Sequence, residues 1–325
     1  MSISSRTKLD DNYSTTVSYS RQLNKLHHER TFWFHLKTLY LFTKSDFKTV
    51  VLPQSLFAIA SVYYSKGFIG SPPQIALRIT LALVWIWTHL LAEDVSNQRL
   101  PDAILEDAVN EPWRPLPSKR LTAAEASLLL RYLLPIAYGL SVLLGATAPS
   151  TTLMAAIYLY NDLEGASCGP YFRNILNAAG LACFGWGAAE ILLAGVTTDI
   201  GMPVKYPYEW IGLTAVIVAT TVQAQDLPDI PGDEARGRQS MPLLYGELWT
   251  RASIAVLVVL WTMTCLVYWE VQSPTVWLVL LSAALSIAIL TLLWLGQDWD
   301  EIVWKLWCIW TTMIFTLPLF SSAPI

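Results

Sequence analysis

Charged side chains are scarce in this 325-residue chain. Only 14% of its residues are Asp, Glu, Lys or Arg, whereas 54% are hydrophobic. In soluble globular domains about a quarter of all residues are charged, so this composition argues against a soluble protein. The composition instead indicates a chain that lies largely in lipid.

Cysteine and runs of basic residues are also rare. Three of the four cysteines fall inside apolar stretches and Cys168 stands alone, so neither a disulfide framework nor a cysteine metal site is expected. No basic run with interleaved aromatic residues occurs, so we expect no nucleic-acid partner. The first 46 residues lack the apolar core and cleavage site of a signal peptide. We expect residues 1–46 to form a polar cytosolic tail and residues 47–325 to form a transmembrane catalytic domain.

Long apolar stretches recur along the remainder of the chain. A helix that crosses a bilayer needs about 20 predominantly apolar residues. We therefore expect an all-α fold, a multi-span transmembrane bundle of about nine helices. The stretches are centred on residues 48–65, 75–92, 126–146, 150–160, 175–196, 208–223, 253–269, 275–295 and 303–320. The fourth is long enough to span only if it extends into residues 161–170.

Lys and Arg are concentrated in alternate connections between these stretches. The N-terminal tail and the connections around residues 99–120, 173, 236–251 and 305 hold most of them, whereas the intervening connections hold only Lys66 and Lys205. Short cytoplasmic loops carry the excess of Lys and Arg, so we expect a cytosolic N-terminus and an odd number of spans. The expected location is the membrane of the endoplasmic reticulum, with the lipid bilayer as the surrounding partner.

Two acidic clusters fall on the expected cytosolic side, over residues 92–120 and 225–242. Carboxylates at four-residue helical steps repel one another unless a cation lies among them. Mg²⁺ bound together with a phosphate group would provide it, since Mg²⁺ takes one or two carboxylates plus waters and phosphate oxygens. An acidic surface that faces only water is the alternative. The four-residue steps join Asp94, Gln98, Asp102 and Glu106 in the first cluster, and Gln225, Asp229 and Asp233 in the second.

Basic residues follow the carboxylates within each acidic cluster. Guanidinium and ammonium groups at such positions would bind phosphate oxygens. Simple positive-inside topology explains Lys119 and Arg120 equally well, whereas Arg236 and Arg238 lie closer to the carboxylates and favour a functional role.

The amino-acid sequences of the two clusters resemble motifs of a known family. Residues 107–118 read Asp-Ala-Val-Asn-Glu-Pro-Trp-Arg-Pro-Leu-Pro-Ser, and residues 229–242 read Asp-Ile-Pro-Gly-Asp-Glu-Ala-Arg-Gly-Arg-Gln-Ser-Met-Pro. Both are similar to motifs of the UbiA superfamily of intramembrane prenyltransferases. The resemblance implies nine helices around a central cavity, built as two related halves. It also implies a prenyl diphosphate substrate bound through Mg²⁺ at the cytosolic mouth.

The first motif departs from the family pattern Asn-x3-Asp-x3-Asp. Counted back from Asp107, the middle aspartate is replaced by Ala103 and the leading asparagine by Arg99. One residue is therefore inserted, and Pro101 marks the place, since proline interrupts a helix. Two registers stay open: Asn97 or Gln98 with Asp102 and Glu106, or Asp102 with Asp107.

The resemblance and the charge pattern together define a candidate site. The expected catalytic carboxylates are Asp102, Glu106, Asp107, Asp229 and Asp233, and these residues with Asp226 are the expected Mg²⁺ ligands. The expected diphosphate contacts are Asn97, Gln98, Asn110, Arg114, Lys119, Arg120, Tyr160, Asn161, Arg173, Asn174, Arg236 and Arg238.

The expected activity is cyclisation of a prenyl chain. Residues 39–53 and the wording of both motifs resemble a fungal branch of the family whose members cyclise the prenyl chain on itself. We therefore expect a Mg²⁺-dependent terpene cyclase acting on a C15 or C20 diphosphate, with transfer to an aromatic or other acceptor as the alternative. An ion-coupled carrier is a remote alternative, since carriers usually place acids near the middle of the bilayer. The sequence indicates no particular protein partner.

The orientation can be tested by cysteine labelling. Cysteines introduced at Ser118 and Ser240 should react with a membrane-impermeant reagent from the cytosolic side only, because both lie in connections rich in Lys and Arg. A cysteine at Ser273 should react only from the opposite side. Labelling of positions 118 and 240 from different sides would contradict a site shared by the two acidic clusters.

Overall fold

The computed structural model describes residues 30–65, 70–194 and 208–322. The chain divides into two compact units, residues 1–41 and 42–325. The described part of the smaller unit belongs mainly to helix α2 (Phe32–Thr43), whose last two residues lie in the larger unit. Most of the tail expected over residues 1–46 lies outside the described residues, as do Lys66 and Lys205.

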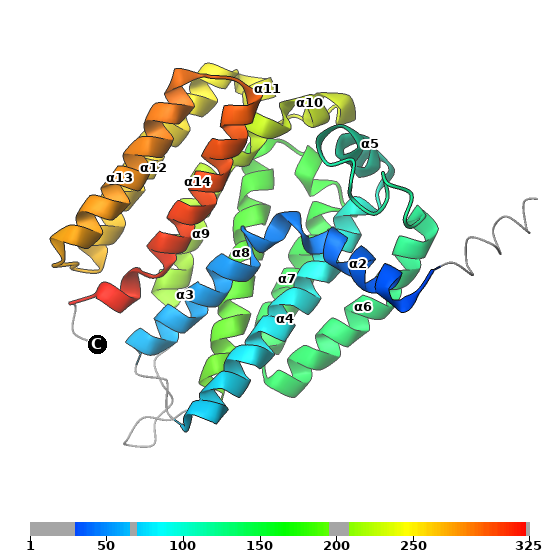
Figure 1. Cartoon of the computed structure of the whole chain (residues 1–325), viewed down its shortest axis with the longest axis horizontal. Helices are drawn as coiled ribbons and strands as arrows, with labels where there is room; N and C mark the ends of the chain where they lie inside the picture. Colours follow the sequence, from blue (N-terminus) through cyan, green and yellow to red (C-terminus); the bar gives the residue numbers. More distant parts are fainter. Residues whose placement is uncertain (1–29, 66–69, 195–207, 323–325) are drawn as a thin grey trace, which may run out of the picture. The chain divides into compact units, whose positions relative to one another are not determined.

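The larger unit is helical throughout its described residues, and the expected all-α fold is confirmed (Figure 1). Its helices of 14 or more residues each overlap one of the nine predicted apolar stretches. They are α3 (Val51–Tyr64), α4 (Pro72–Gln98), α6 (Ala123–Leu144), α7 (Thr147–Tyr160), α8 (Pro170–Leu193), α9 (Tyr208–Thr221), α12 (Glu247–Tyr268), α13 (Pro274–Leu293) and α14 (Gln297–Phe315). Shorter helices α5 (Pro101–Asn110), α10 (Asp226–Arg236) and α11 (Met241–Tyr245) lie in the connections.

Five of the described helices, α4, α6, α8, α12 and α13, are long and apolar enough to cross a membrane. Helices α3, α7 and α9 have only 14 residues each. At 1.5 Å per residue such a helix is about 21 Å long, shorter than a hydrocarbon core of about 30 Å. The extension of the fourth stretch into residues 161–170 is not formed, because α7 ends at Tyr160 and a short 3-10 turn, Gly165–Ser167, follows.

Helix α8 packs against α3, α4, α7 and α9. Two of its glycines allow close approach of neighbouring helices, as small residues do in membrane bundles. A Cβ atom on Gly185 would lie 2.7 Å from Phe57 Cδ1 of α3, and one on Gly187 would lie 2.2 Å from Trp85 Cη2 of α4. The Trp85 ring is fixed, because its Nε1 donates a hydrogen bond of 2.7 Å to Ser141 Oγ.

Two apolar clusters form the core, and both include residues of α3 and α8. One combines these helices mainly with α4 and α7, and the other combines them with α9, α12, α13 and α14. Because α3 and α8 contribute to both, they hold the two parts of the core together.

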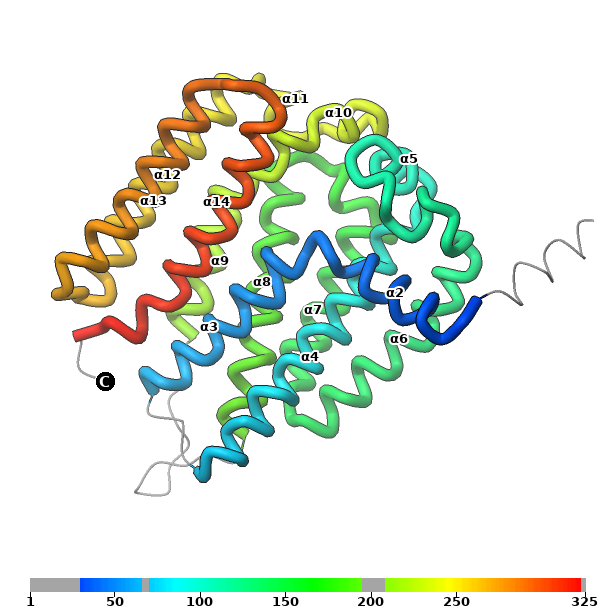
Figure 2. Tube along the Cα trace, in the orientation of Figure 1, coloured from blue at the N-terminus to red at the C-terminus, as the bar shows by residue number. Residues whose placement is uncertain are grey.

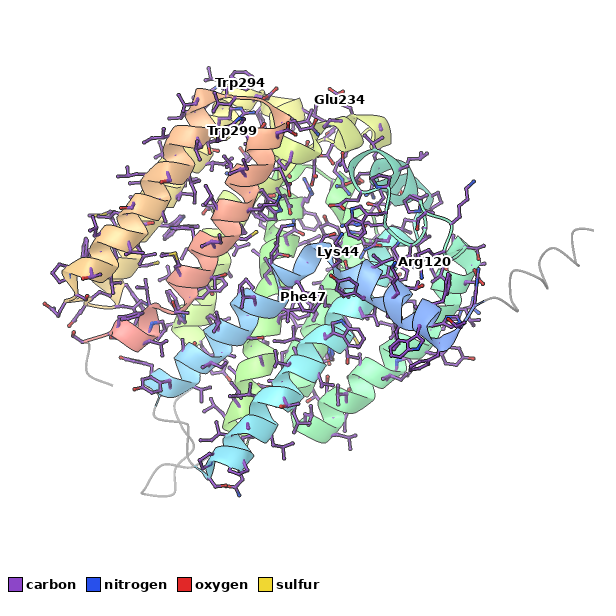
Figure 3. All side chains as sticks on the ribbon, in the orientation of Figure 1. Lys44, Phe47, Arg120, Glu234, Trp294 and Trp299 are labelled. Atoms are coloured by element: carbon purple, nitrogen blue, oxygen red, sulfur yellow. The ribbon has the colours of Figure 1, made fainter. Side chains whose placement is uncertain are left out.

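The connections that carry the acidic clusters meet at one end of the larger unit. Helices α5 and α10 pack side by side there (Figures 1 and 2). Trp294, Trp299 and Glu234 lie at the same end (Figure 3). Trp294 is 51% exposed and Trp299 is 42% exposed, as is typical of tryptophans at a membrane–water interface. The connection between α12 and α13 lies at the opposite end (Figure 2).

The packing of α8 predicts a difference between two glycines. Gly187→Ala should destabilise the protein by about 1–3 kcal/mol, because the added methyl group collides with the fixed Trp85 ring. Gly139 of α6 is the matched control: a Cβ atom there would meet nothing within 4 Å, so Gly139→Ala should be neutral or stabilising by up to about 1 kcal/mol. Thermal unfolding in detergent measures both. Equal unfolding temperatures for the two variants would contradict this account of α8.

Candidate active site

The first acidic cluster is carried by two helices rather than by one. Helix α4 ends at Gln98 and α5 begins at Pro101. Leu100 between them has an extended backbone, with φ −74° and ψ 141°, the conformation favoured before proline. The expectation that Asp94, Gln98, Asp102 and Glu106 share one helical face is therefore wrong, because the helix is interrupted between the second and third of them.

The end of α4, α5 and α10 surround a polar cavity of about 160 Å³. Its wall combines nine of the expected site residues with five that were not in the expected set. The expected residues are Asn97, Gln98, Glu106, Asp107, Arg114, Tyr160, Arg173, Asp229 and Arg238. The others are Asp46, Glu93, Asp94, Asn177 and Gln225.

Ion pairs join the two acidic clusters at and beside this cavity. Glu106 of α5 accepts hydrogen bonds from Arg236 Nη1 at 2.8 Å and from Arg238 Nη1 at 3.0 Å. Arg236 also pairs with Asp102 at 2.7 Å, and Arg238 pairs with Asp233 at 3.2 Å. Two arginines of the second cluster thus hold carboxylates of the first in place.

A left-handed turn explains why Arg236 and Arg238 differ. Gly237 ends α10 with φ 75°, a conformation that glycine adopts without strain. The backbone nitrogen of Arg238 then donates to the carbonyl oxygen of Asp233 at 2.9 Å, which closes the helix end. Arg238 is thereby brought back over the helix and lines the polar cavity, whereas Arg236 does not.

Close packing of α5 on α10 sets the spacing of the two clusters. Asn110 Nδ2 donates to the carbonyl oxygen of Asp229 at 3.4 Å. A Cβ atom on Gly232 would lie 2.2 Å from the same Nδ2 atom. Glycine at position 232 is therefore needed for this approach.

The electrostatic surroundings shift the pKa values of the cavity carboxyl groups in different directions. Burial alone would raise the pKa of Glu106, but the guanidinium groups of Arg238, Arg236 and Arg173 outweigh it and hold the pKa below its usual value. At Asp229 the balance is opposite, because burial and then the negative charges of Asp233 and Glu106 raise the pKa well above its usual value. Burial likewise raises the pKa of Asp107 to about 6, although Arg114 pairs with it at 2.7 Å.

Oxygen atoms without hydrogen-bond partners mark a place for a cation. Among the described residues, no partner is found for Asp94 Oδ2, Gln98 Oε1 or Asp107 Oδ2, although all three atoms are buried. The Gln98 amide is oriented, because its Nε2 donates to Phe42 O at 2.9 Å and to Asp94 Oδ1 at 3.3 Å. Buried acceptors are nearly always satisfied, so these three on one cavity wall call for a ligand.

Charge balance also favours a metal ion in the polar cavity. Six carboxyl groups and three guanidinium groups line it. A diphosphate would add further negative charge, so its binding requires cations. Within the described part of the chain, no three His, Cys, Asp or Glu side chains are close enough to hold a metal by themselves. The residues fit Mg²⁺, which takes few protein ligands and completes its shell with water and phosphate oxygens.

An apolar chamber of about 120 Å³ adjoins the polar cavity. The two share a rim formed by Asp46, Glu93, Tyr160, Asn177 and Gln225. Beyond the rim the chamber is lined mainly by aliphatic and aromatic side chains of α7, α8 and α14. The arrangement suits an amphiphile with an anionic head and an apolar chain.

Several expected site residues do not line either space. Asp102 is 47% exposed, so the aspartate common to both open registers is absent from the cavity. Asp226 and Asp233 are fully buried, and Asp226 pairs with Arg173 at 2.6 Å. The remaining residues outside the cavity and chamber walls are Asn110, Lys119, Arg120, Asn161, Asn174 and Arg236.

Three wall residues had sequence signals that our expectations did not use. Asp46 lies within residues 39–53, the stretch that resembles fungal members of the family. Glu93 directly precedes Asp94 in the first cluster, and Asn177 follows Arg173 by one helical turn on α8.

Comparisons with known proteins identify the family. The model of the UbiA prenyltransferase family matches residues 55–312. Fumagillin beta-trans-bergamotene synthase af520 of Aspergillus fumigatus is 34% identical over 242 residues, which cover 72% of this chain and 75% of the relative. Somaliensene A/B synthase of Streptomyces somaliensis is 31% identical over 227 residues, which cover 68% and 70%.

The fold is also found among solved structures. A UbiA homolog from Archaeoglobus fulgidus bound to GPP and Mg²⁺ has a TM-score of 0.59 at 12% identity, over 87% of this chain and 98% of the other. At this identity the likeness shows the fold alone. The family match runs from α3 to α14 and includes all or part of every long helix around the cavity. The chain therefore belongs to the UbiA prenyltransferase family.

Proposed function

We propose that the protein is a membrane terpene cyclase that ionises a prenyl diphosphate and closes the prenyl chain into a ring. The observation that carries the proposal is the shared rim between a polar cavity and an apolar chamber. The first offers charged and polar groups to a diphosphate, and the second offers apolar side chains to a prenyl chain. The names of the two relatives, which are synthases of beta-trans-bergamotene and somaliensene, support cyclisation.

The proposed reaction starts at the bond between C1 of the prenyl chain and the diphosphate oxygen. Both electrons of that bond leave with the diphosphate, and an allylic cation remains. The π electrons of a distant double bond then form a carbon–carbon bond to the cation. This ring closure leaves the positive charge on the other carbon of that double bond. A base then removes a proton from an adjacent carbon, and a new double bond forms. The products are a cyclic hydrocarbon, diphosphate and a proton.

Residues of the polar cavity would stabilise the leaving group. Arg114 and Arg238 present guanidinium groups to the cavity, where a diphosphate would accept their hydrogen bonds. One or two carboxylates of the cavity wall, with Asp107 and Asp229 as the candidates, would hold Mg²⁺ together with water and phosphate oxygens, and the ion would neutralise negative charge that develops on the diphosphate. Charge stabilisation of this kind lowers the barrier because it is strongest in the transition state.

Prenyl transfer to an acceptor is the second candidate, and the match to a prenyltransferase family favours it. The two are separated by incubating the purified protein in detergent with Mg²⁺ and C10, C15 or C20 diphosphates, followed by analysis of the organic extract. A cyclic hydrocarbon formed without an added acceptor supports cyclisation. Consumption of substrate only in the presence of an aromatic or quinone precursor supports transfer.

The location of the site completes the proposal. The protein is an integral membrane protein, and we propose that the polar cavity faces the cytosol from the endoplasmic reticulum membrane. The concentration of Lys and Arg near both acidic clusters supports this orientation. A carrier function has less support, because helices α5 and α10, which carry three of the six carboxyl groups of the cavity, lie at one end of the larger unit (Figure 1).

The acidic residues predict a graded response to substitution. Asp229→Asn and Asp107→Asn should each lower kcat by about 100-fold or more, because each removes a carboxylate from the cavity wall. Asp102→Asn is the matched control, since this residue has the same side chain and lies on the same helix as Asp107 but is outside the cavity. Its kcat should change by only a few fold. Removal of divalent cations with EDTA should abolish turnover of the parent protein, and Mg²⁺ should restore it.

Diphosphate release and product formation are the measurements, with thermal unfolding in detergent as the check on folding. Wild-type kcat in Asp229→Asn or Asp107→Asn would contradict the proposed metal ligands. A loss in Asp102→Asn as large as in Asp107→Asn would instead point to the contact between α5 and α10 as the common cause.

The two arginines of the second cluster also predict different effects. Arg238→Ala should lower kcat by about 10–1000-fold, because Arg238 lines the cavity and its charge is needed most in the transition state. Arg238→Lys should recover part of this loss, since lysine keeps the charge but not the two-pronged geometry. Arg236→Ala should have a smaller effect, since it removes a pair to Glu106 but no cavity group. Steady-state kinetics of the three variants measure these effects. Equal kcat for Arg236→Ala and Arg238→Ala would contradict different roles for the two arginines.

A further inference from the structure

Three of the four tryptophans on helix α14 follow one another at three-residue steps: Trp304, Trp307 and Trp310. The rings of Trp304 and Trp307 are stacked, with centroids 4.9 Å apart and an angle of 18° between their planes. Both line the apolar chamber, and Trp310 does not. The same helix therefore presents two indoles to the chamber and keeps a third in the core.

The three tryptophans also differ in their hydrogen bonds. Trp310 is fully buried, and its Nε1 donates to Thr262 Oγ1 at 2.8 Å. Trp307 is also buried, at 2% exposure, but its Nε1 has no acceptor among the residues that the structure describes. Buried indole nitrogens usually find an acceptor. Trp307 thus lacks the hydrogen bond that fixes Trp310, and the features that distinguish it are its stacked partner and its place in the chamber wall.

Most of the remaining chamber wall cannot stabilise positive charge. Its side chains beyond the rim are largely aliphatic, such as Leu153, Ile157 and Leu181, with Phe184 as a further aromatic ring. A cation surrounded by aliphatic groups loses its solvation without compensation. The face of an indole attracts a cation more strongly than that of any other side-chain ring, and the attraction grows when water is absent.

We propose that the stacked Trp304–Trp307 pair contacts the prenyl cation and directs its ring closure. This inference rests on the proposed cyclase function. After the diphosphate leaves, the positive charge must move from the polar rim toward a distant double bond inside the chamber. The two indole faces stabilise the charge there. Without them the cation stays near the rim, where water adds to it and loses a proton, or a carboxylate of the rim removes a proton from a neighbouring carbon, and acyclic products result.

The inference separates ionisation from cyclisation, and that separation is measurable. Trp304 and Trp307 are each replaced by Phe and by Leu, and diphosphate release and organic products are quantified for each variant. The products are compared per molecule of diphosphate released by the same variant, so that a change in prenyl binding or in the rate of ionisation does not affect the comparison. The ratio of cyclic to acyclic product should fall in the order Trp, Phe, Leu, which follows the strength of cation–π attraction.

Trp310→Phe and Trp310→Leu are the matched controls. They change the same residue type on the same helix and remove the bond to Thr262, so they should lower the unfolding temperature and leave the product ratio unchanged. An unchanged product ratio in all four chamber variants would overturn the inference. So would an equal change of the ratio in the Trp310 variants, because it would show that loss of core packing is the cause.

If the chamber variants do not fold, fluorinated tryptophans provide a second test of the same inference. Site-specific incorporation of one, two or three fluorine atoms at position 304 or 307 weakens the indole face while nearly preserving its size. The cyclic fraction should decrease stepwise with fluorine number, and the absence of a trend would overturn the inference. Failure of the parent protein to release diphosphate from any C10, C15 or C20 substrate would instead overturn the proposed function itself.

Discussion

Pairing of buried charges is the constraint on which the site depends. Within the polar cavity, Arg114, Arg173 and Arg238 each contact a carboxylate of an acidic cluster. A buried charge without a partner is strongly destabilising, so these arginines cannot be placed independently of their carboxylates. Each guanidinium group of the cavity is already paired with a carboxylate, and the carboxyl groups of the wall outnumber the guanidinium groups. A metal ion, as proposed for diphosphate binding, would offset this excess.

Much of the helical frame was predictable from the sequence, because lipid imposes a simple rule on length and composition. Each of the nine long helices overlaps an apolar stretch, even α3, α7 and α9, which are only 14 residues long. The break at Pro101 was also visible, since proline cannot continue a helix from α4. Its consequence was not, because a change of helix direction alters which face each later residue joins.

The parts of the site that escaped prediction depend on contacts between distant segments. Asp46, Glu93 and Asn177 lie on three different elements, and only tertiary packing brings them to one rim. The difference between Arg236 and Arg238 depends on a single left-handed residue, Gly237, at the end of α10. Local spacing identifies such residues as candidates, but it does not tell which of two neighbours faces the cavity.

The contact between Asn110 and Gly232 has a consequence for how the chain can change. The two residues belong to different motifs, and one fills the space that a side chain on the other would need. A larger residue at position 232 is compatible only with a smaller one at position 110. The two motifs therefore form a single unit of inheritance, and a chimera that takes one of them from a relative must take the other as well.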